Sequence, residues 1–113
     1  MTARRGEVWL VDFGDPVGRE QSGRRPAIVV SADPLNESRA GVLIVVPITT
    51  THRGLPSHVE IEPDRSGLDE VSYAKCEDVK SISEERLIAR LGAATDAITF
   101  DIGRVLRFLL DIP

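Results

Sequence analysis

Short apolar runs rich in β-branched residues recur along the sequence, and glycine, proline or aspartate follows most of them within a few positions. Runs of this kind between turn residues are typical of β-strands. The run 42–48 has no polar alternation, which predicts a central strand buried on both faces, with Pro47 marking its end, a bulge or an edge. The expected strands span residues 8–13, 26–31, 42–48, 58–62, 72–81 with an acidic bulge, and 87–92.

Helical periodicity is confined to the C-terminal part of the sequence. Apolar residues follow Thr95, a suitable N-cap, at the spacing of one helix face through residues 96–110. Shorter helical turns are expected after Ser83 and within 32–39. The sequence therefore predicts a mostly β (α+β) fold, a small barrel of antiparallel strands with a C-terminal amphipathic helix, in a single domain spanning 1–113.

The charge balance restricts the kinds of partner that the chain can bind. The 113 residues carry a net charge of −4. Residues 1–56 have a net charge of +1 and residues 57–113 one of −5. A general polyanion binder is excluded, so a nucleic-acid site must be a local cluster of basic groups.

The single cysteine, Cys76, excludes an internal disulfide and, beside only two histidines, a closed zinc site. We expect it to be a buried small apolar residue. The N-terminus lacks the apolar stretch of a signal peptide, and no segment approaches 18 apolar residues. These features predict a cytoplasmic protein with no membrane association.

Two polar clusters lie at the ends of expected strands. Arg24 and Arg25 close a long glycine-bearing loop, and Thr49 opens the polar run 49–53. Guanidinium groups suit phosphate binding, although such arginines can merely solubilise a loop end. Strand-end threonines can likewise serve only local backbone groups. If the two strands are antiparallel neighbours, Arg25 approaches Thr49.

Familiar catalytic signatures are absent from the sequence. Glycine-rich phosphate-binding motifs, the G-x-S-x-G elbow and H-E-x-x-H all fail to occur. His58 falls on the outward face of an alternating strand, where a solvated or capping histidine is expected. His52 follows the threonine run and is placed to face a site.

Several ordered motifs resemble the MazF/PemK (Kid) family of bacterial toxin endoribonucleases. They are RRGEVWLVDFG (4–14), GRRPAIVVSADPLN (23–36), VPIT (46–49), THRGLPSHVEI (51–61) and GLDEVSYAKCEDVKSIS (67–83). The resemblance extends from Arg5 to the terminal helix. It implies an SH3-like/CcdB-like barrel, a homodimer, cleavage of single-stranded RNA without metal or other cofactor, and neutralisation by a cognate antitoxin.

The same resemblance implies roles for particular residues. Arg25 and Thr49 correspond to the catalytic pair. The expected RNA contacts are Arg19, Gln21, Arg24, Thr50, His52, Ser72, Glu77 and Asp78; many relatives have glutamine in place of Asp78. Because a guanidinium barely deprotonates, Glu20, His52 or water is the expected proton-transfer group.

The expected reaction is attack of the RNA 2′-hydroxyl on the adjacent phosphate, which leaves 2′,3′-cyclic phosphate and 5′-hydroxyl ends. Two alternatives belong to other functional classes. One is a non-enzymatic poison of a protein target, like the gyrase poison CcdB. The other is a regulatory DNA- or partner-binding subunit.

Overall fold

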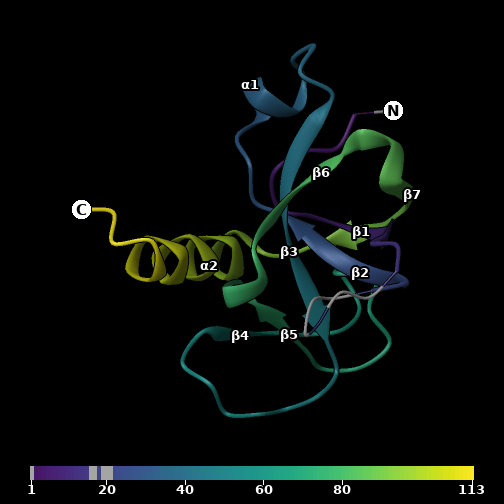
Figure 1. Ribbon diagram of the computed structural model, residues 1–113. Coiled ribbons are helices and arrows are strands. Elements are labelled where there is room, and N and C mark those ends of the chain that lie inside the picture. The colour runs from purple at the N-terminus through teal and green to yellow at the C-terminus, as the bar shows by residue number, and fades with distance from the viewer. Residues whose placement is uncertain (1, 16–17, 19–21) are drawn as a thin grey trace.

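The computed structural model describes residues 2–15, 18 and 22–113 (Figure 1). Seven strands are joined by short helical turns and followed by one long helix. The elements are β1 (Glu7–Asp12), β2 (Arg24–Val29), α1 (Asp33–Asn36), β3 (Val42–Thr49), β4 (His58–Ile61), β5 (Ser72–Lys75), the 3-10 turn η1 (Cys76–Asp78), β6 (Lys80–Ser83), the 3-10 turn η2 (Glu84–Arg86), β7 (Leu87–Ala93) and α2 (Asp96–Leu109).

The strands form one antiparallel sheet in the order β4-β5-β3-β2-β1-β7, and β6 pairs with β3 outside this path. The predicted class, mostly β with a C-terminal helix, is confirmed. The predicted barrel is not closed, because among the described residues neither β4 nor β6 pairs with β7. The η2 turn redirects the chain after β6, and β7 then pairs with β1.

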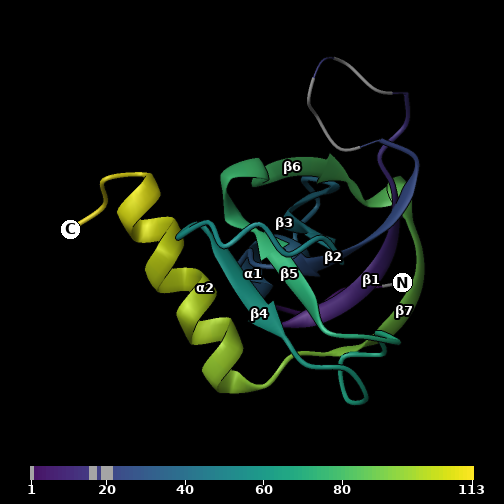
Figure 2. The ribbon, with the colours of Figure 1, turned by 90° about the horizontal axis from the view of Figure 1, so that it is seen from below.

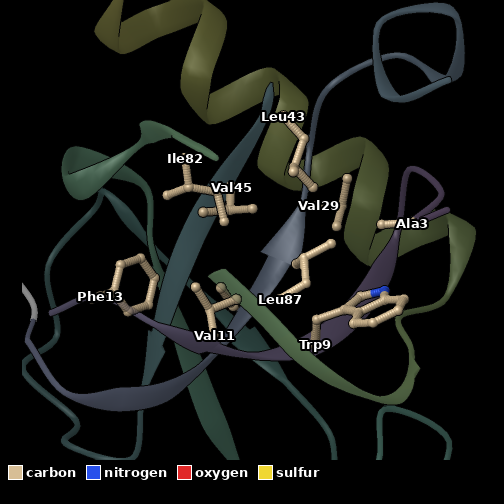
Figure 3. Close-up of a cluster of buried hydrophobic side chains, with 10 residues drawn as sticks. Ala3, Trp9, Val11, Phe13, Val29, Leu43, Val45, Ile82 and Leu87 are labelled. Atoms are coloured by element: carbon tan, nitrogen blue, oxygen red, sulfur yellow. The ribbon is translucent and has the colours of Figure 1, made fainter. Parts of the chain in front are cut away.

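Two apolar clusters lie on opposite faces of β1, β2 and β3. Val11, Val29 and Val45 belong to the cluster that β6 and β7 cover, whose side chains point toward one another in Figure 3. The intervening residues Ile28 and Val46 belong to the second cluster. Alternate residues of these strands are therefore buried on both faces, as predicted for 42–48.

Helix α2 closes the second cluster. Figure 2 shows it lying along β4, and its buried Ile102 packs in the same cluster as Ile61 and Cys76. Thr95 caps the helix, because its side chain accepts a hydrogen bond of 3.2 Å from the Ile98 amide. The predicted cap, amphipathic face and buried cysteine are all confirmed. Among the described residues, no helix is long and apolar enough to span a membrane.

Three local expectations are corrected by the strand pairing. Strand β2 begins at Arg24, two residues before the predicted Pro26, because Asp12 and Val11 of β1 pair with its two arginines. Pro47 is buried within β3, between the segment that pairs with β6 and the segment that pairs with β5. A residue without an N–H is tolerated there because the strand changes partner. The expected acidic bulge is the η1 turn, which separates β5 from β6.

The motif GEVW (6–9) has a structural role. The side chain of Glu7 accepts hydrogen bonds from the Trp9 indole at 3.1 Å and the Arg4 amide at 2.8 Å, and it forms an ion pair with Arg90 at 2.7 Å. Although partial burial raises the pKa of Glu7, these partners lower it below its ordinary range. The motif therefore ties the N-terminal segment to β7.

Candidate active site

A pocket of about 390 Å³ opens where β2 begins and β3 ends. Arg25, Thr49, Thr50 and Ser72 from the sequence-based set all line it. Its remaining walls are Pro26, Ile48, Thr51, Gly67, Leu68, Asp69, Glu70 and Leu91. The structure thus brings together the two residues expected to form the catalytic pair.

Strand register explains why Arg25 and Thr49 meet. Strands β2 and β3 are antiparallel neighbours that pair from Ala27–Pro47 to Val29–Val45. Arg25 and Thr49 each lie two residues beyond the Ala27–Pro47 pair, where an unchanged register would place them on the same face of the sheet. The predicted antiparallel neighbours are confirmed, and Arg25 and Thr49 line one pocket.

Both groups of this pair have donors available for a ligand. The Nε of Arg25 donates to the Ser22 carbonyl at 3.0 Å, which orients the exposed guanidinium. Within the described part of the chain, no hydrogen bond occupies its two terminal amino groups. Among the described residues, no carboxylate forms an ion pair with Arg25. The Thr49 hydroxyl accepts from the Thr51 amide at 3.2 Å, so its hydrogen remains available to donate. The arrangement suits an anionic group that accepts from both side chains.

The long loop before β2 is anchored by a narrow neck. The Phe13 amide donates to the Gly23 carbonyl at 2.9 Å, and the Gly23 amide donates to the Gly14 carbonyl at 2.8 Å. Arg24 lies at the exposed start of β2 and does not line the pocket. The predicted contacts Arg19 and Gln21, and the predicted proton-transfer group Glu20, lie outside the described residues.

His52 lies beside the pocket and stacks on Tyr73. Their ring centroids are 5.0 Å apart, with an angle of 22° between the ring planes. Tyr73 is directly opposite Thr49 in the register of β3 and β5. The sequence-based set included His52 but missed Tyr73. The feature that could have indicated Tyr73 is its place in the segment after the Gly67-Leu68 turn.

Glu77 and Asp78 are held in another network. The Glu77 carboxylate accepts from the Ser57 hydroxyl at 2.8 Å and pairs with Nε2 of His58 at 2.9 Å. His58 lies on the outward face of β4, as predicted, but the expectation that it is solvated is wrong, because η1 folds Glu77 against it and its side chain is only 3% exposed. Asp78 forms an ion pair of 2.9 Å with Lys75. Neither acidic residue lines the pocket.

The Glu77 network makes a testable contribution to acid stability. Partial burial raises the pKa of Glu77, but hydrogen bonds from His58, its own backbone amide and Ser57 lower it below the ordinary value of 4.5. A lowered carboxyl pKa stabilises the fold above the unfolded-state value, and the stabilisation is lost as the pH falls through the folded-state value.

We therefore expect Glu77→Gln to flatten the decline of stability below pH 4.5. Because the carboxylate is partly exposed, the difference should stay below about 1 kcal/mol. Urea unfolding at neutral and acidic pH measures it, with exposed Glu62→Gln as the matched control. Equal acid sensitivity of Glu77→Gln and the unchanged protein would contradict this assignment.

Two acidic pocket residues were not anticipated from the sequence. Asp69 and Glu70 lie in the turn before β5, and the Ser72 hydroxyl donates to the Glu70 carbonyl at 2.9 Å. Their carboxylates place hydrogen-bond acceptors in the wall that also contains Gly67. The clue in the sequence was the acidic pair directly after Gly67-Leu68. Within the described residues, no three His, Cys, Asp or Glu side chains gather as a metal site.

The fold and pocket define a small β protein with an open sheet and with an arginine and a threonine in one pocket. Residues 4–110 match the family described as "PemK-like, MazF-like toxin of type II toxin-antitoxin system". The chain is 34% identical to Endoribonuclease MazF9 of Mycobacterium tuberculosis, covering 96% of this chain and 97% of that protein. It is 29% identical to Endoribonuclease EndoA of Bacillus subtilis, covering 97% of this chain and 96% of that protein.

Solved structures agree with these relatives. The crystal structure of MazF from Deinococcus radiodurans superimposes with a TM-score of 0.84 at 25% identity and covers 99% of each chain. A mycobacterial endoribonuclease in complex with its cognate antitoxin gives a TM-score of 0.81 at 26% identity, covering 98% of this chain and 97% of that one. This chain belongs to the PemK-like, MazF-like toxin family. The predicted family is confirmed, and the names of the relatives support the predicted enzyme class, an endoribonuclease.

Proposed function

We propose that the chain is a toxin endoribonuclease that cleaves single-stranded RNA at the Arg25–Thr49 pocket. The observation that carries the proposal is the shared pocket, which is lined by both an arginine with a permanently charged guanidinium and a threonine with a hydroxyl donor. An RNA phosphate seated between them would accept from both side chains. In this proposal, residues 1–113 act as one toxin domain.

The chemistry uses a nucleophile that the substrate itself carries. The 2′-hydroxyl oxygen attacks the adjacent phosphorus, the bond to the 5′-oxygen of the next nucleotide breaks, and that oxygen takes up a proton. The products are a 2′,3′-cyclic phosphate and a 5′-hydroxyl. Arg25 stabilises the charge that builds up on the phosphorane oxygens, and Thr49 donates to the same centre. Proton transfer falls to Glu20, His52 or water, and no metal is required.

Further groups would contact the rest of the substrate. Thr50 and Ser72 line the same pocket and can bind the sugar-phosphate backbone or a base edge. Arg19, Gln21 and Arg24 belong to the loop proposed to cover the RNA. Glu77 and Asp78 remain proposed contacts for a longer RNA segment, because their network lies outside the pocket.

The proposed setting is a cytoplasmic homodimer neutralised by an antitoxin. The related mycobacterial endoribonuclease was solved with its cognate antitoxin, which supports this kind of partner for the present chain. An acidic, partly disordered antitoxin segment could compete with RNA for the donors of Arg25. Because the net charge is −4, such binding must use the local basic cluster together with apolar anchors.

The proposal is tested by incubating the purified protein with a long unstructured RNA in excess EDTA and mapping the new ends. We expect discrete cuts with 5′-hydroxyl ends, and the surrounding sequence identifies the preferred site. Intact RNA from a folded protein would overturn the proposal and favour a protein-directed poison or a regulatory binder.

A further inference from the structure

A row of directly opposed side chains crosses three strands on the sheet face turned away from the α2 cluster. Tyr73 of β5 lies opposite Thr49 on one side and Glu60 of β4 on the other. If the register of β2 and β3 continues two residues beyond the Ala27–Pro47 pair, Arg25 of β2 extends the row. Ile48, the neighbour of Thr49, points into the α2 cluster instead. Neighbouring strands lie about 4.8 Å apart, so an aromatic ring adjoins the catalytic pair on the Thr49 side.

The ring of Tyr73 supports a second ring that solvent can reach. His52 stacks on it at 5.0 Å and 22°, and His52 is exposed whereas Tyr73 is partly buried. Among the described residues, this is the one stacked ring pair. Trp9 and Phe13 are buried in the apolar core, and the other two aromatic residues lie on α2. His52, which follows the pocket residue Thr51, is therefore a solvent-exposed ring with one face on Tyr73.

Stacking on exposed rings is how proteins commonly hold single-stranded RNA bases. Every nucleobase has a π-face, and histidine and tyrosine rings serve as platforms for it. A base continuing the order Tyr73–His52 would extend a stack that begins directly opposite Thr49. Stacking there holds the strand without hydrogen-bond readout, so it contributes to binding of the RNA.

We propose that His52, seated on Tyr73, is a stacking platform for the nucleobase next to the scissile phosphate. The inference rests on the proposed RNA cleavage and assigns His52 a contact to substrate, with Tyr73 as its positioning residue. It gives His52 a task that needs its flat ring and does not need its proton. The platform is therefore separable by experiment from a proton-transfer role.

The decisive comparison is between His52→Ala and His52→Phe, measured on an oligoribonucleotide containing one mapped cut site. Loss of the ring should raise KM roughly 5- to 150-fold, the range expected for one stacked base, with little change in kcat. Phenylalanine keeps a flat ring without a titratable nitrogen, so His52→Phe should restore KM to within a few-fold of the unchanged protein. A His52→Phe variant as defective as His52→Ala, or a loss confined to kcat, would overturn the platform.

Tyr73 variants and an abasic substrate separate stacking from a purely structural role. Tyr73→Phe should retain activity, whereas Tyr73→Leu, similar in bulk but without a π-face, should raise KM. Removing the stacked base from the RNA should weaken cleavage by the unchanged protein as much as His52→Ala does, with no further loss when the two changes are combined. If removal of any neighbouring base gave a loss that multiplied with the loss from His52→Ala, the inference would be contradicted.

Circular dichroism and thermal unfolding establish that each variant is folded. An unchanged protein that cuts no RNA would overturn the proposed function itself. An unchanged protein that cuts RNA with no dependence on the ring at position 52 would overturn the platform alone.

Discussion

Arg25→Ala is expected to lower the rate of RNA cleavage about 100- to 1,000-fold, the usual cost of removing one donor to a transition-state oxyanion. The guanidinium is exposed and oriented by the Ser22 carbonyl, and the folded chain pairs it with no described carboxylate. Its removal should therefore leave stability almost unchanged. Single-turnover cleavage of an RNA that contains a mapped cut site measures the effect.

Arg24→Ala is the matched control for this loss. Arg24 is the neighbouring arginine on the same strand. It lies opposite Asp12 in the register of β1 and β2, and it does not line the pocket. We expect Arg24→Ala to weaken RNA binding modestly, in a salt-dependent way, and to leave kcat near its original value. Equal kcat losses for the two variants would contradict the assignment of Arg25 to the reacting phosphate.

Gly67→Ala is expected to destabilise the fold by about 2–4 kcal/mol, the combined cost of a left-handed backbone and an overpacked contact. Gly67 has a φ of +78°, and a Cβ built there would lie 2.0 Å from the Leu91 carbonyl oxygen. The clash involves the backbone of β7, so a change of rotamer cannot relieve it. Because Gly67 and Leu91 both line the pocket, the same variant should also distort the wall opposite Arg25.

Gly41→Ala isolates the contribution of backbone conformation. Gly41 has a φ of +70°, but a Cβ there would meet nothing within 4 Å. We expect it to cost about 1–2 kcal/mol, from the left-handed conformation alone. Urea unfolding of both variants gives the comparison, and a Gly67→Ala cost no larger than that of Gly41→Ala would show that the approach to Leu91 can relax.

Much of the fold is predictable from local patterns in the sequence. The unbroken apolar run before Thr49 indicated a strand buried on both faces, and Thr95 was recognised as the cap of the terminal helix. The openness of the sheet was not predictable in this way. It depends on which strand the chain pairs with after η2, and pairing between distant strands leaves no local pattern.

The shared pocket of Arg25 and Thr49 was predictable because the two residues lie at matching ends of antiparallel neighbours. The places of Tyr73, Asp69 and Glu70 were not, since the pairing of β5 with β3 brings Tyr73 opposite Thr49 and the preceding turn to the pocket. His58 was misread because strand alternation places its side chain outward, whereas Glu77 of η1 covers it. Long-range contacts of this kind override strand periodicity.

If Arg25 and Thr49 act on a phosphate attacked by the 2′-hydroxyl of the RNA itself, cleavage requires that hydroxyl. The most direct test compares two oligonucleotides in EDTA, one entirely RNA and one with a single 2′-deoxynucleotide directly 5′ of the mapped cut. We expect the all-RNA strand to give 2′,3′-cyclic phosphate and 5′-hydroxyl ends, and the substituted strand to remain intact. Cleavage of the substituted strand at the same bond would contradict attack by the 2′-hydroxyl.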